Sequence, residues 1–147
     1  MYKHILIPTD GSELSEKAIK SGSALAKTLN AKITGLHIIP SVSPIYYGEV
    51  AWIDPKLDNQ MRETARAEGN KYLDRVEATA KSAGVTSERV LLESELVWKT
   101  IIDTAQARRC DLILMAAHGR GGLSALVLGS ETNKVLTHSK IPVLVYR

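Results

Sequence analysis

Hydrophobic residues along the chain follow two patterns that alternate from one end to the other. Short, nearly continuous apolar runs, such as residues 4–8, are typical of strands that are buried on both faces. Longer segments between them repeat their apolar residues on one helical face, as Leu14, Ala18 and Leu25 do. The pattern predicts strands at residues 4–8, 32–39, 89–92, 111–117 and 141–146, and helices at residues 12–30, 55–82, 95–108 and from Ser130 onward.

The order of these elements indicates a single α/β domain. Strands that alternate with helices form parallel βαβ units, whose right-handed crossovers cover both faces of the sheet with helices. No internal repeat, linker or shift in composition divides the chain, so we expect one domain over residues 1–147. Ligands of such open sheets bind beyond the carboxyl ends of the strands, where the strand order reverses. Function is therefore expected in the loops at residues 9–12, 39–41 and 116–122.

The loop after the first strand, from Pro8 to Ser12, carries the first candidate chemistry. The carboxylate of Asp10 can accept hydrogen bonds from a ribose or join a bound metal ion. Asp10 and Ser12 are also residue types that favour helix starts, so the pair equally fits a purely local helix cap. Both interpretations place Asp10 at the start of the following helix.

The loop after the fourth strand carries the second candidate chemistry. The segment His118-Gly119-Arg120-Gly121-Gly122 is rich in glycine, which lets backbone N–H groups turn inward and approach a ligand closely. Gly129-Ser130 then opens a helix, whose N-terminus attracts anions and to which Ser130 adds a hydroxyl donor. Arg120 could pair with a phosphate or face solvent, and His118 could contact a phosphate or shape the turn. We interpret the loop as a phosphate cradle, with a plain flexible connection as the alternative.

Composition and charge exclude several classes of function. The 147 residues are 44% hydrophobic and 24% charged, with a formal net charge of +3 and basic residues interspersed among acidic ones. This distribution lacks the clustered basic face of a nucleic-acid-binding protein. No stretch approaches the roughly 20 apolar residues of a membrane span, and the first apolar run is too short for a secretory signal. The single cysteine, Cys110, fits a reducing compartment, so we expect a cytoplasmic protein.

Motifs of catalysis, of metal binding and of other nucleotide folds are absent from the sequence. No spacing of cysteine, histidine and carboxylate residues points to a metal cage, and no nucleophile–base pair is visible. The chain has neither the Gly-x-x-x-x-Gly-Lys-Ser/Thr of a P-loop nor a Gly-x-Gly-x-x-Gly after its first strand. We therefore expect a protein that is not an enzyme and that has no metal site of its own.

The glycine spacing, together with several further segments, resembles one known family. Gly119, nine further residues and then Gly129-Ser130 match the second half of the ATP-binding motif of universal stress proteins, Gly-x-x-Gly, nine residues, Gly-Ser/Thr. The resemblance covers the whole chain, and the combination is specific although no single piece is. The other segments that carry it are residues 5–12 (Ile-Leu-Ile-Pro-Thr-Asp-Gly-Ser), 36–38 (Leu-His-Ile), 115–122 (Met-Ala-Ala-His-Gly-Arg-Gly-Gly) and 141–145 (Ile-Pro-Val-Leu-Val).

The resemblance implies a fold, a ligand and a site. The fold is a doubly wound open sheet of five parallel strands in the order 3-2-1-4-5, which brings the two candidate loops face to face. The ligand is ATP, with or without Mg²⁺, acting in a regulatory or stress-response role and hydrolysed slowly or not at all. The residues that the resemblance assigns to the nucleotide are Pro8, Thr9 and Asp10 at the adenosine, the backbone of Ile38 at the adenine edge, and Ala116, His118, Gly119, Arg120, Gly121, Gly122, Gly129, Ser130, Glu131 and Thr132 at the ribose and phosphates.

One residue departs from the family pattern. Ala116 stands where the motif has its first glycine. An alanine methyl crowds a close backbone approach and disfavours a positive φ, whereas a negative φ tolerates it. The backbone conformation at Ala116 therefore decides whether the motif is effectively complete.

Two further segments are candidates for contacts with partners. The last strand, residues 141–146, is an apolar edge that needs a cover, and the resemblance implies that it pairs with its copy in a homodimer. The loop at residues 40–54 carries Tyr46, Tyr47 and Trp52, which could cover the nucleotide or a partner surface. Such aromatic residues more often pack their own loop onto the domain.

Two other functions stay open beside a nucleotide-binding regulatory protein. A dimeric interaction module of the same fold that has lost its nucleotide would fit Ala116, whereas Gly119, Gly129 and Ser130 favour binding. An ATP pyrophosphatase of the related adenine-nucleotide hydrolase fold would carry Ser-Gly-Gly-x-Asp-Ser after the first strand. This chain has Thr-Asp-Gly-Ser at residues 9–12 instead, which argues against that enzyme.

Overall fold

The computed structural model describes residues 1–41, 55–120 and 128–147. Strands and helices alternate along these residues, and all the strands are parallel. The aromatic residues of the 40–54 loop lie outside the described residues, as do Gly121 and Gly122. The elements are β1 (His4–Pro8), α1 (Glu13–Leu29), β2 (Lys32–Pro40), α2 (Pro55–Ser82), β3 (Ser87–Ser94), α3 (Val97–Ala107), β4 (Leu112–Ala116), α4 (Ser130–His138) and β5 (Val143–Tyr146).

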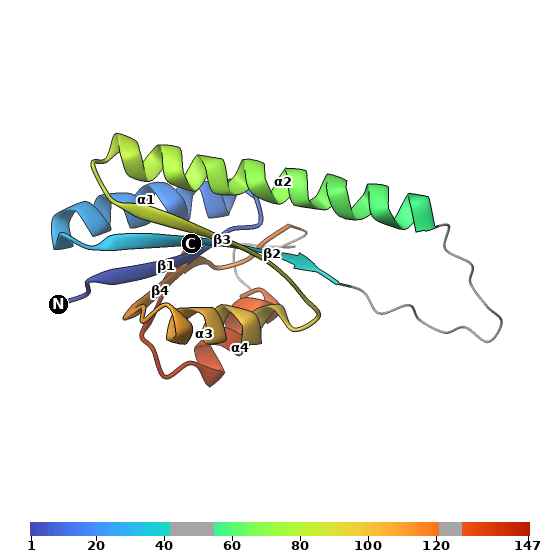
Figure 1. Cartoon of the computed structure of the whole chain (residues 1–147). Helices are drawn as coiled ribbons and strands as arrows, with labels where there is room; N and C mark the ends of the chain where they lie inside the picture. Colours follow the sequence, from blue (N-terminus) through green and yellow to red (C-terminus); the bar gives the residue numbers. More distant parts are fainter. Residues whose placement is uncertain (42–54, 121–127) are drawn as a thin grey trace.

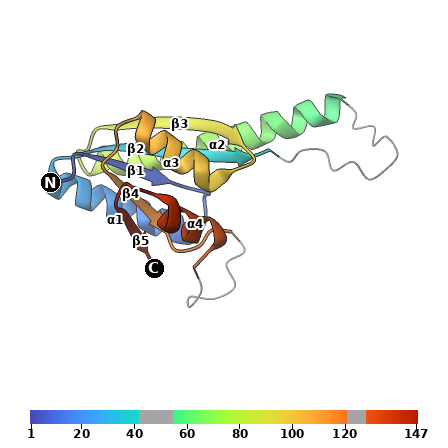
Figure 2. The ribbon, with the colours of Figure 1, turned by 90° about the horizontal axis from the view of Figure 1, so that it is seen from below.

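The strands form one five-stranded sheet in the order β3-β2-β1-β4-β5, which confirms the predicted fold (Figures 1 and 2). Helices α1 and α2 cover one face of the sheet, and α3 and α4 cover the other (Figure 1). The strand order reverses between β1 and β4, whose carboxyl ends therefore open a space that no neighbouring crossover fills. None of the described helices is both long and apolar enough to cross a membrane.

Local sequence signals fix the first helix. The side chain of Ser12 caps α1 by accepting a hydrogen bond of 3.2 Å from the Ser15 N–H. Glu13 and Glu16 lie in the first turn, where the helix dipole favours negative charge. The helix ends at Asn30, which adopts a left-handed φ of 52° and whose N–H bonds the last carbonyls. The predicted start and stop of this helix are both confirmed.

Alternating strand residues divide the core into two clusters. Ile5, Ile7 and Leu114 are buried against α1 and α2, whereas Leu6 and Ile113 are buried against α3 and α4. Because both faces of a parallel sheet are covered, its central strands read as continuous apolar runs in the sequence. This arrangement explains why the pattern located β1 and β4 closely.

The outer strands differ in length from their predicted bounds. β3 pairs with β2 from Ser87 to Ser94, so it is longer than the predicted strand at residues 89–92. Its additional residues are mostly polar. They adopt strand conformation because they pair with β2, and not because they are hydrophobic. At the other edge, β5 begins at Val143, two residues later than the predicted 141–146. Pro142 cannot donate a ladder hydrogen bond, which limits the strand at this point.

Candidate functional site

A cleft opens at the carboxyl edge of the sheet, where the strand order reverses. It encloses about 610 Å³, a volume typical of small-molecule sites. Every residue that the sequence assigned to a nucleotide and that the structure describes lines this one cleft. Residues that lie more than 100 positions apart in the chain are thus brought together by the sheet order, as the resemblance implies.

The end of β1 forms the floor of the cleft. Thr9 is buried, and its N–H donates to the Leu36 carbonyl at 2.8 Å, which continues the pairing of β1 with β2. Its hydroxyl lies 3.1 Å from the Ser15 hydroxyl. The Nδ1 atom of His37 lies 2.8 Å from the Thr9 carbonyl oxygen, so Nδ1 carries the proton and donates. His37 therefore links the end of β2 to the end of β1, and the residue also lines the cleft.

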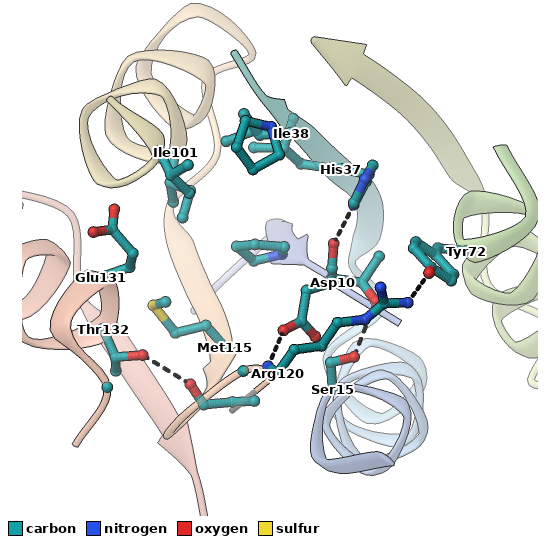
Figure 3. A pocket seen from close by; sticks show the side chains of 18 of the residues that line it. Asp10, Ser15, His37, Ile38, Tyr72, Ile101, Met115, Arg120, Glu131 and Thr132 are labelled. Atoms are coloured by element: carbon teal, nitrogen blue, oxygen red, sulfur yellow. Dashed lines mark hydrogen bonds between the residues drawn. The ribbon is translucent and has the colours of Figure 1, made fainter. Parts of the chain in front are cut away.

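The carboxylate of Asp10 joins the two candidate loops. Its Oδ1 accepts the Ser12 N–H at 3.0 Å, and its Oδ2 accepts the Arg120 N–H at 2.8 Å (Figure 3). Burial by itself raises the pKa of Asp10, but hydrogen bonds from the side chain and backbone of Ser12 and from the Arg120 N–H outweigh it. The pKa of Asp10 therefore lies below its ordinary value. The local cap expected at this position exists, and the same carboxylate also anchors the glycine loop.

Gly119 is required by this anchor. A Cβ built at residue 119 would overlap Oδ2 of Asp10 and would lie 3.2 Å from its Cγ. The φ of Gly119 is not in the left-handed region, so the constraint comes from close approach rather than from backbone conformation. Any side chain at this position must displace the Asp10 carboxylate or the loop.

Backbone groups of β2 face the cleft where β1 has ended. Leu36 presents its carbonyl to the Thr9 N–H, on the β1 side of the strand. Groups two residues apart in a strand point to the same side, so the N–H and carbonyl of Ile38 also point there, beyond the end of β1. Among the described residues, no backbone group pairs with them. Ile38 thus offers one donor and one acceptor at the edge of the cleft.

Apolar side chains form one wall of the cleft. Ile38, Ile101 and Met115 are each less than 10% exposed and line it together, with Val97 at the start of α3 (Figure 3). Their spacing in the sequence is that of ordinary core residues, so no sequence signal distinguished them. An apolar wall beside a free donor and acceptor suits a flat heteroaromatic ring.

The N-terminus of α4 forms the opposite end of the cleft. The helix begins at Ser130, and its N-cap residue Gly129 supplies no side chain to bond the first N–H groups. A side chain at Gly129 would meet the backbone of His118 at 3.2 Å, so this glycine allows the glycine loop and α4 to pack together. Thr132 fixes the helix in place because its hydroxyl donates to the Ala116 carbonyl at 3.0 Å. The arrangement leaves helix N–H groups available to an anion.

Glu131 has a structural partner. Its Oε2 accepts the Trp98 N–H at 2.8 Å and thereby caps the N-terminus of α3, where Leu96 provides no side-chain cap. Its Oε1 accepts a hydrogen bond from Lys134 at 3.1 Å. The predicted contact of Glu131 with a ligand can therefore come from its backbone at the start of α4. Its carboxylate meanwhile keeps its hydrogen bond to the N-terminus of α3.

The backbone conformation of Ala116 is one that any residue can adopt. Ala116 ends β4, pairs with Tyr146 of β5, and is not among the described residues with positive φ. Its side chain is 9% exposed and packs in the core cluster under α1 and α2. The methyl group thus follows the inward alternation of Leu112 and Leu114 along the strand. A glycine at this position would remove packing without relieving strain.

Two described loop residues have distinct positions in the cleft. His118 is half-buried and lines the cleft, and its backbone lies against Gly129. Arg120 is exposed, but its guanidinium contacts Tyr72 of α2 rather than solvent alone. Tyr72 lines the cleft, as do Ala65 and Glu68 of the same helix. The spacing of these α2 residues fits an amphipathic helix, so no sequence signal assigned them to the site. Among the described residues, no cluster of three or more His, Cys, Asp or Glu side chains could hold a metal ion.

Comparison with known proteins identifies the family to which this fold and this site belong. The model of the universal stress protein family matches residues 1–147. This chain belongs to the universal stress protein family. A curated member, universal stress protein MJ0531 of Methanocaldococcus jannaschii, is 32% identical over 149 residues, which cover 100% of this chain and 83% of the relative. The resemblance inferred from the sequence is therefore confirmed.

Solved structures of universal stress proteins share the architecture. The structure of MJ0577 from the same archaeon superposes with a TM-score of 0.81 at 27% identity, covering 99% of this chain and 96% of the other. A universal stress protein from Archaeoglobus fulgidus, solved in complex with dAMP, has a TM-score of 0.66 at 16% identity, with 99% and 98% covered. At that identity the second comparison establishes the common fold.

Proposed function

We propose that this universal stress protein binds an adenine nucleotide, in the first place ATP, in the cleft at the carboxyl edge of its sheet. The observation that carries the proposal is the backbone donor and acceptor of Ile38, which have no backbone partner among residues 1–41, 55–120 and 128–147 and face a cleft that ends at the N-terminus of α4. The first feature suits the polar edge of a purine, and the second suits phosphate. The dAMP complex of the Archaeoglobus fulgidus relative is consistent with the same ligand class.

The residues around the cleft fit the parts of such a ligand. The wall of Ile38, Ile101 and Met115 would cover the base. Asp10 lies at the middle of the cleft, where a carboxylate can accept hydrogen bonds from ribose hydroxyls. The Ser130 hydroxyl and the first N–H groups of α4 would hold phosphate oxygens, with a divalent cation such as Mg²⁺ balancing part of their charge.

We propose further that the nucleotide acts as a ligand with slow or no hydrolysis, in a cytoplasmic stress-response role. Both carboxylate oxygens of Asp10 already accept backbone N–H groups, and Glu131 caps α3. A carboxylate that is held in this way is a poor general base, because its lowered pKa and its fixed hydrogen bonds oppose proton uptake. This arrangement supports nucleotide retention over turnover.

Identification of a co-purifying ligand tests the proposal. The full chain is purified, denatured and chromatographed, and we expect an adenine nucleotide at close to one per subunit. In parallel, the nucleotide-free protein is titrated with ATP in the presence of Mg²⁺ by calorimetry. Release of no nucleotide together with no heat of binding would reject the proposal and favour a nucleotide-free interaction module.

The exposed edge of the sheet supports a homodimer as part of this proposal. β5 is an edge strand, and Leu144 on it is 39% exposed. An uncovered apolar edge strand readily pairs with another strand. When β5 pairs with β5 of a second copy, the edge strands of both copies gain hydrogen-bond partners. We expect a dimeric mass by sedimentation equilibrium for the full chain. A monomeric mass at every concentration tested would contradict the homodimer.

A further inference from the structure

Charge is unevenly divided around the cleft. Among the described residues that line it, three are carboxylates, Asp10, Glu68 and Glu131, whereas one, Arg120, is a permanent cation. The sequence at residues 42–54 and 121–127 contains no lysine or arginine. A phosphate in this cleft therefore depends on the Arg120 guanidinium for side-chain cationic charge. The position of that guanidinium decides how strongly phosphate charge is recognised.

The Arg120 guanidinium rests on Tyr72 of α2. Its Nη2 donates to the Tyr72 hydroxyl, and its Cζ lies 5.1 Å from the centroid of the Tyr72 ring. Both contacts attract a cation, the first as a hydrogen bond and the second through the electrons of the ring. Tyr72 is a rigid partner, because it is 8% exposed and its ring meets His37 edge-on at 5.1 Å.

This resting position lies away from the proposed phosphate site. In Figure 3 the tip of Arg120 points toward Tyr72, while Glu131 and Thr132 of α4 lie across the cleft. The backbone N–H of Arg120 stays bound to Asp10 at 2.8 Å, so the loop is held independently of the side chain. The guanidinium can turn about its own side-chain bonds, but it must leave Tyr72 to meet a phosphate at the start of α4.

We propose that Tyr72 is a specificity-determining residue that acts through Arg120. In the empty cleft it holds the guanidinium away from the phosphate site, and a ligand must contribute enough phosphate charge to release it. The inference rests on the proposed function, because the phosphate site is that of the proposed nucleotide. A bound nucleoside leaves the Arg120 guanidinium on Tyr72. Bound ATP attracts the guanidinium to its phosphates, so the protein loses the contacts between Arg120 and Tyr72. Because only differential affinity shifts such an equilibrium, Tyr72 lowers the ratio of ATP affinity to adenosine affinity.

Calorimetric titration of the full chain with ATP and with adenosine tests this role. Tyr72→Phe removes the hydroxyl and keeps the ring, so we expect the affinity ratio to rise about threefold. Tyr72→Leu removes both contacts, and we expect a rise of about tenfold. Arg120→Gln keeps the backbone N–H that binds Asp10 and should lower the ratio. In the Arg120→Gln background, Tyr72→Phe should change the ratio no further, because the two residues then have no interaction to lose.

A spectroscopic measurement follows the guanidinium directly. The ring current of Tyr72 should shift the Arg120 Nε–H resonance of the empty protein, and ATP but not adenosine should remove that shift. Tyr72→Phe is nearly isosteric, so it keeps the test valid if Tyr72→Leu fails to fold. A ratio that stays constant or falls in Tyr72→Phe, or an unchanged resonance with bound ATP, overturns the inference and leaves the proposed function standing. Wild-type protein that binds neither compound overturns both.

Discussion

Gly119→Val is expected to weaken nucleotide binding by about 100-fold while the protein stays folded. Even the Cβ of the new side chain would overlap Oδ2 of Asp10, and two further methyl carbons enlarge the conflict. The Asp10 carboxylate or the glycine loop must therefore move, and the bond from the Arg120 N–H to Asp10 is lost. Loss of about two hydrogen bonds between the displaced loop and the ligand, at about 1.5 kcal/mol each, corresponds to a fall in ATP affinity of about 100-fold.

Titration calorimetry and thermal melts together measure this effect. We expect the free energy of unfolding to fall by only about 1–3 kcal/mol, the usual cost of overpacking, because the overlap lies at the edge of the sheet. Lys140→Val introduces the same side chain at an exposed position between α4 and β5 and serves as the control. Undiminished ATP affinity in Gly119→Val would move the phosphate site away from this loop.

Asp10→Asn is expected to weaken both the fold and the site. The carboxylate accepts backbone N–H groups on each of its oxygens, from Ser12 and from Arg120. An amide of the same size must direct its NH₂ group at one of these donors, so one bond is lost and donor faces donor. Hydrogen bonds to charged groups each contribute about 1.5–3 kcal/mol, so we expect a loss of about 2–3 kcal/mol in unfolding free energy. ATP affinity should fall at least about tenfold, because the loop loses its anchor.

The dependence of stability on pH separates this effect from simple destabilisation. The folded-state pKa of Asp10 lies below 3.8, the value of an unperturbed aspartate, so folding favours the ionised form. Its contribution to stability is complete above pH 3.8 and is lost as the pH falls through the folded-state pKa. Urea melts between pH 2 and pH 6 should show this loss in the wild type and a weaker dependence in Asp10→Asn.

Asp103→Asn is the matched control for Asp10→Asn. Asp103 has a side chain that is 55% exposed and pairs with Lys99 on the surface of α3, so its loss should cost less than about 1 kcal/mol. Equal dependence of unfolding free energy on pH in the Asp10 and Asp103 variants would show that the Asp10–Arg120 hydrogen bond does not stabilise the fold.

Features that depend on neighbouring residues were predicted well from the sequence. The Ser12 cap, the left-handed stop at Asn30 and the start of α4 at Ser130 follow from short-range chemistry, and the structure confirms them. The central strands were found because burial on both faces leaves a continuous apolar run. The strand order came from the resemblance, since periodicity by itself does not say which strands are neighbours.

Features that depend on long-range contacts were missed or left open. The Asp10–Arg120 bond joins residues that are 110 positions apart, and Arg120 meets Tyr72 across 48 positions. The sequence does not mark Ile101 and Met115 as cleft residues, because a side chain that lines a cleft has the same periodicity as one beneath a helix. No pattern in the sequence separates these two environments.

The sequence by itself determined the α/β class, the helix limits and the glycine at 119 that a phosphate loop needs. Tertiary structure decided the structural roles of Ala116 and Gly119. Strand pairing with Tyr146 fixes Ala116 in extended backbone and places it in the core cluster, so its φ does not call for a glycine. Close approach of Asp10, rather than a special φ, makes Gly119 necessary. Both outcomes depend on which surfaces meet in space, and local propensity does not contain that information.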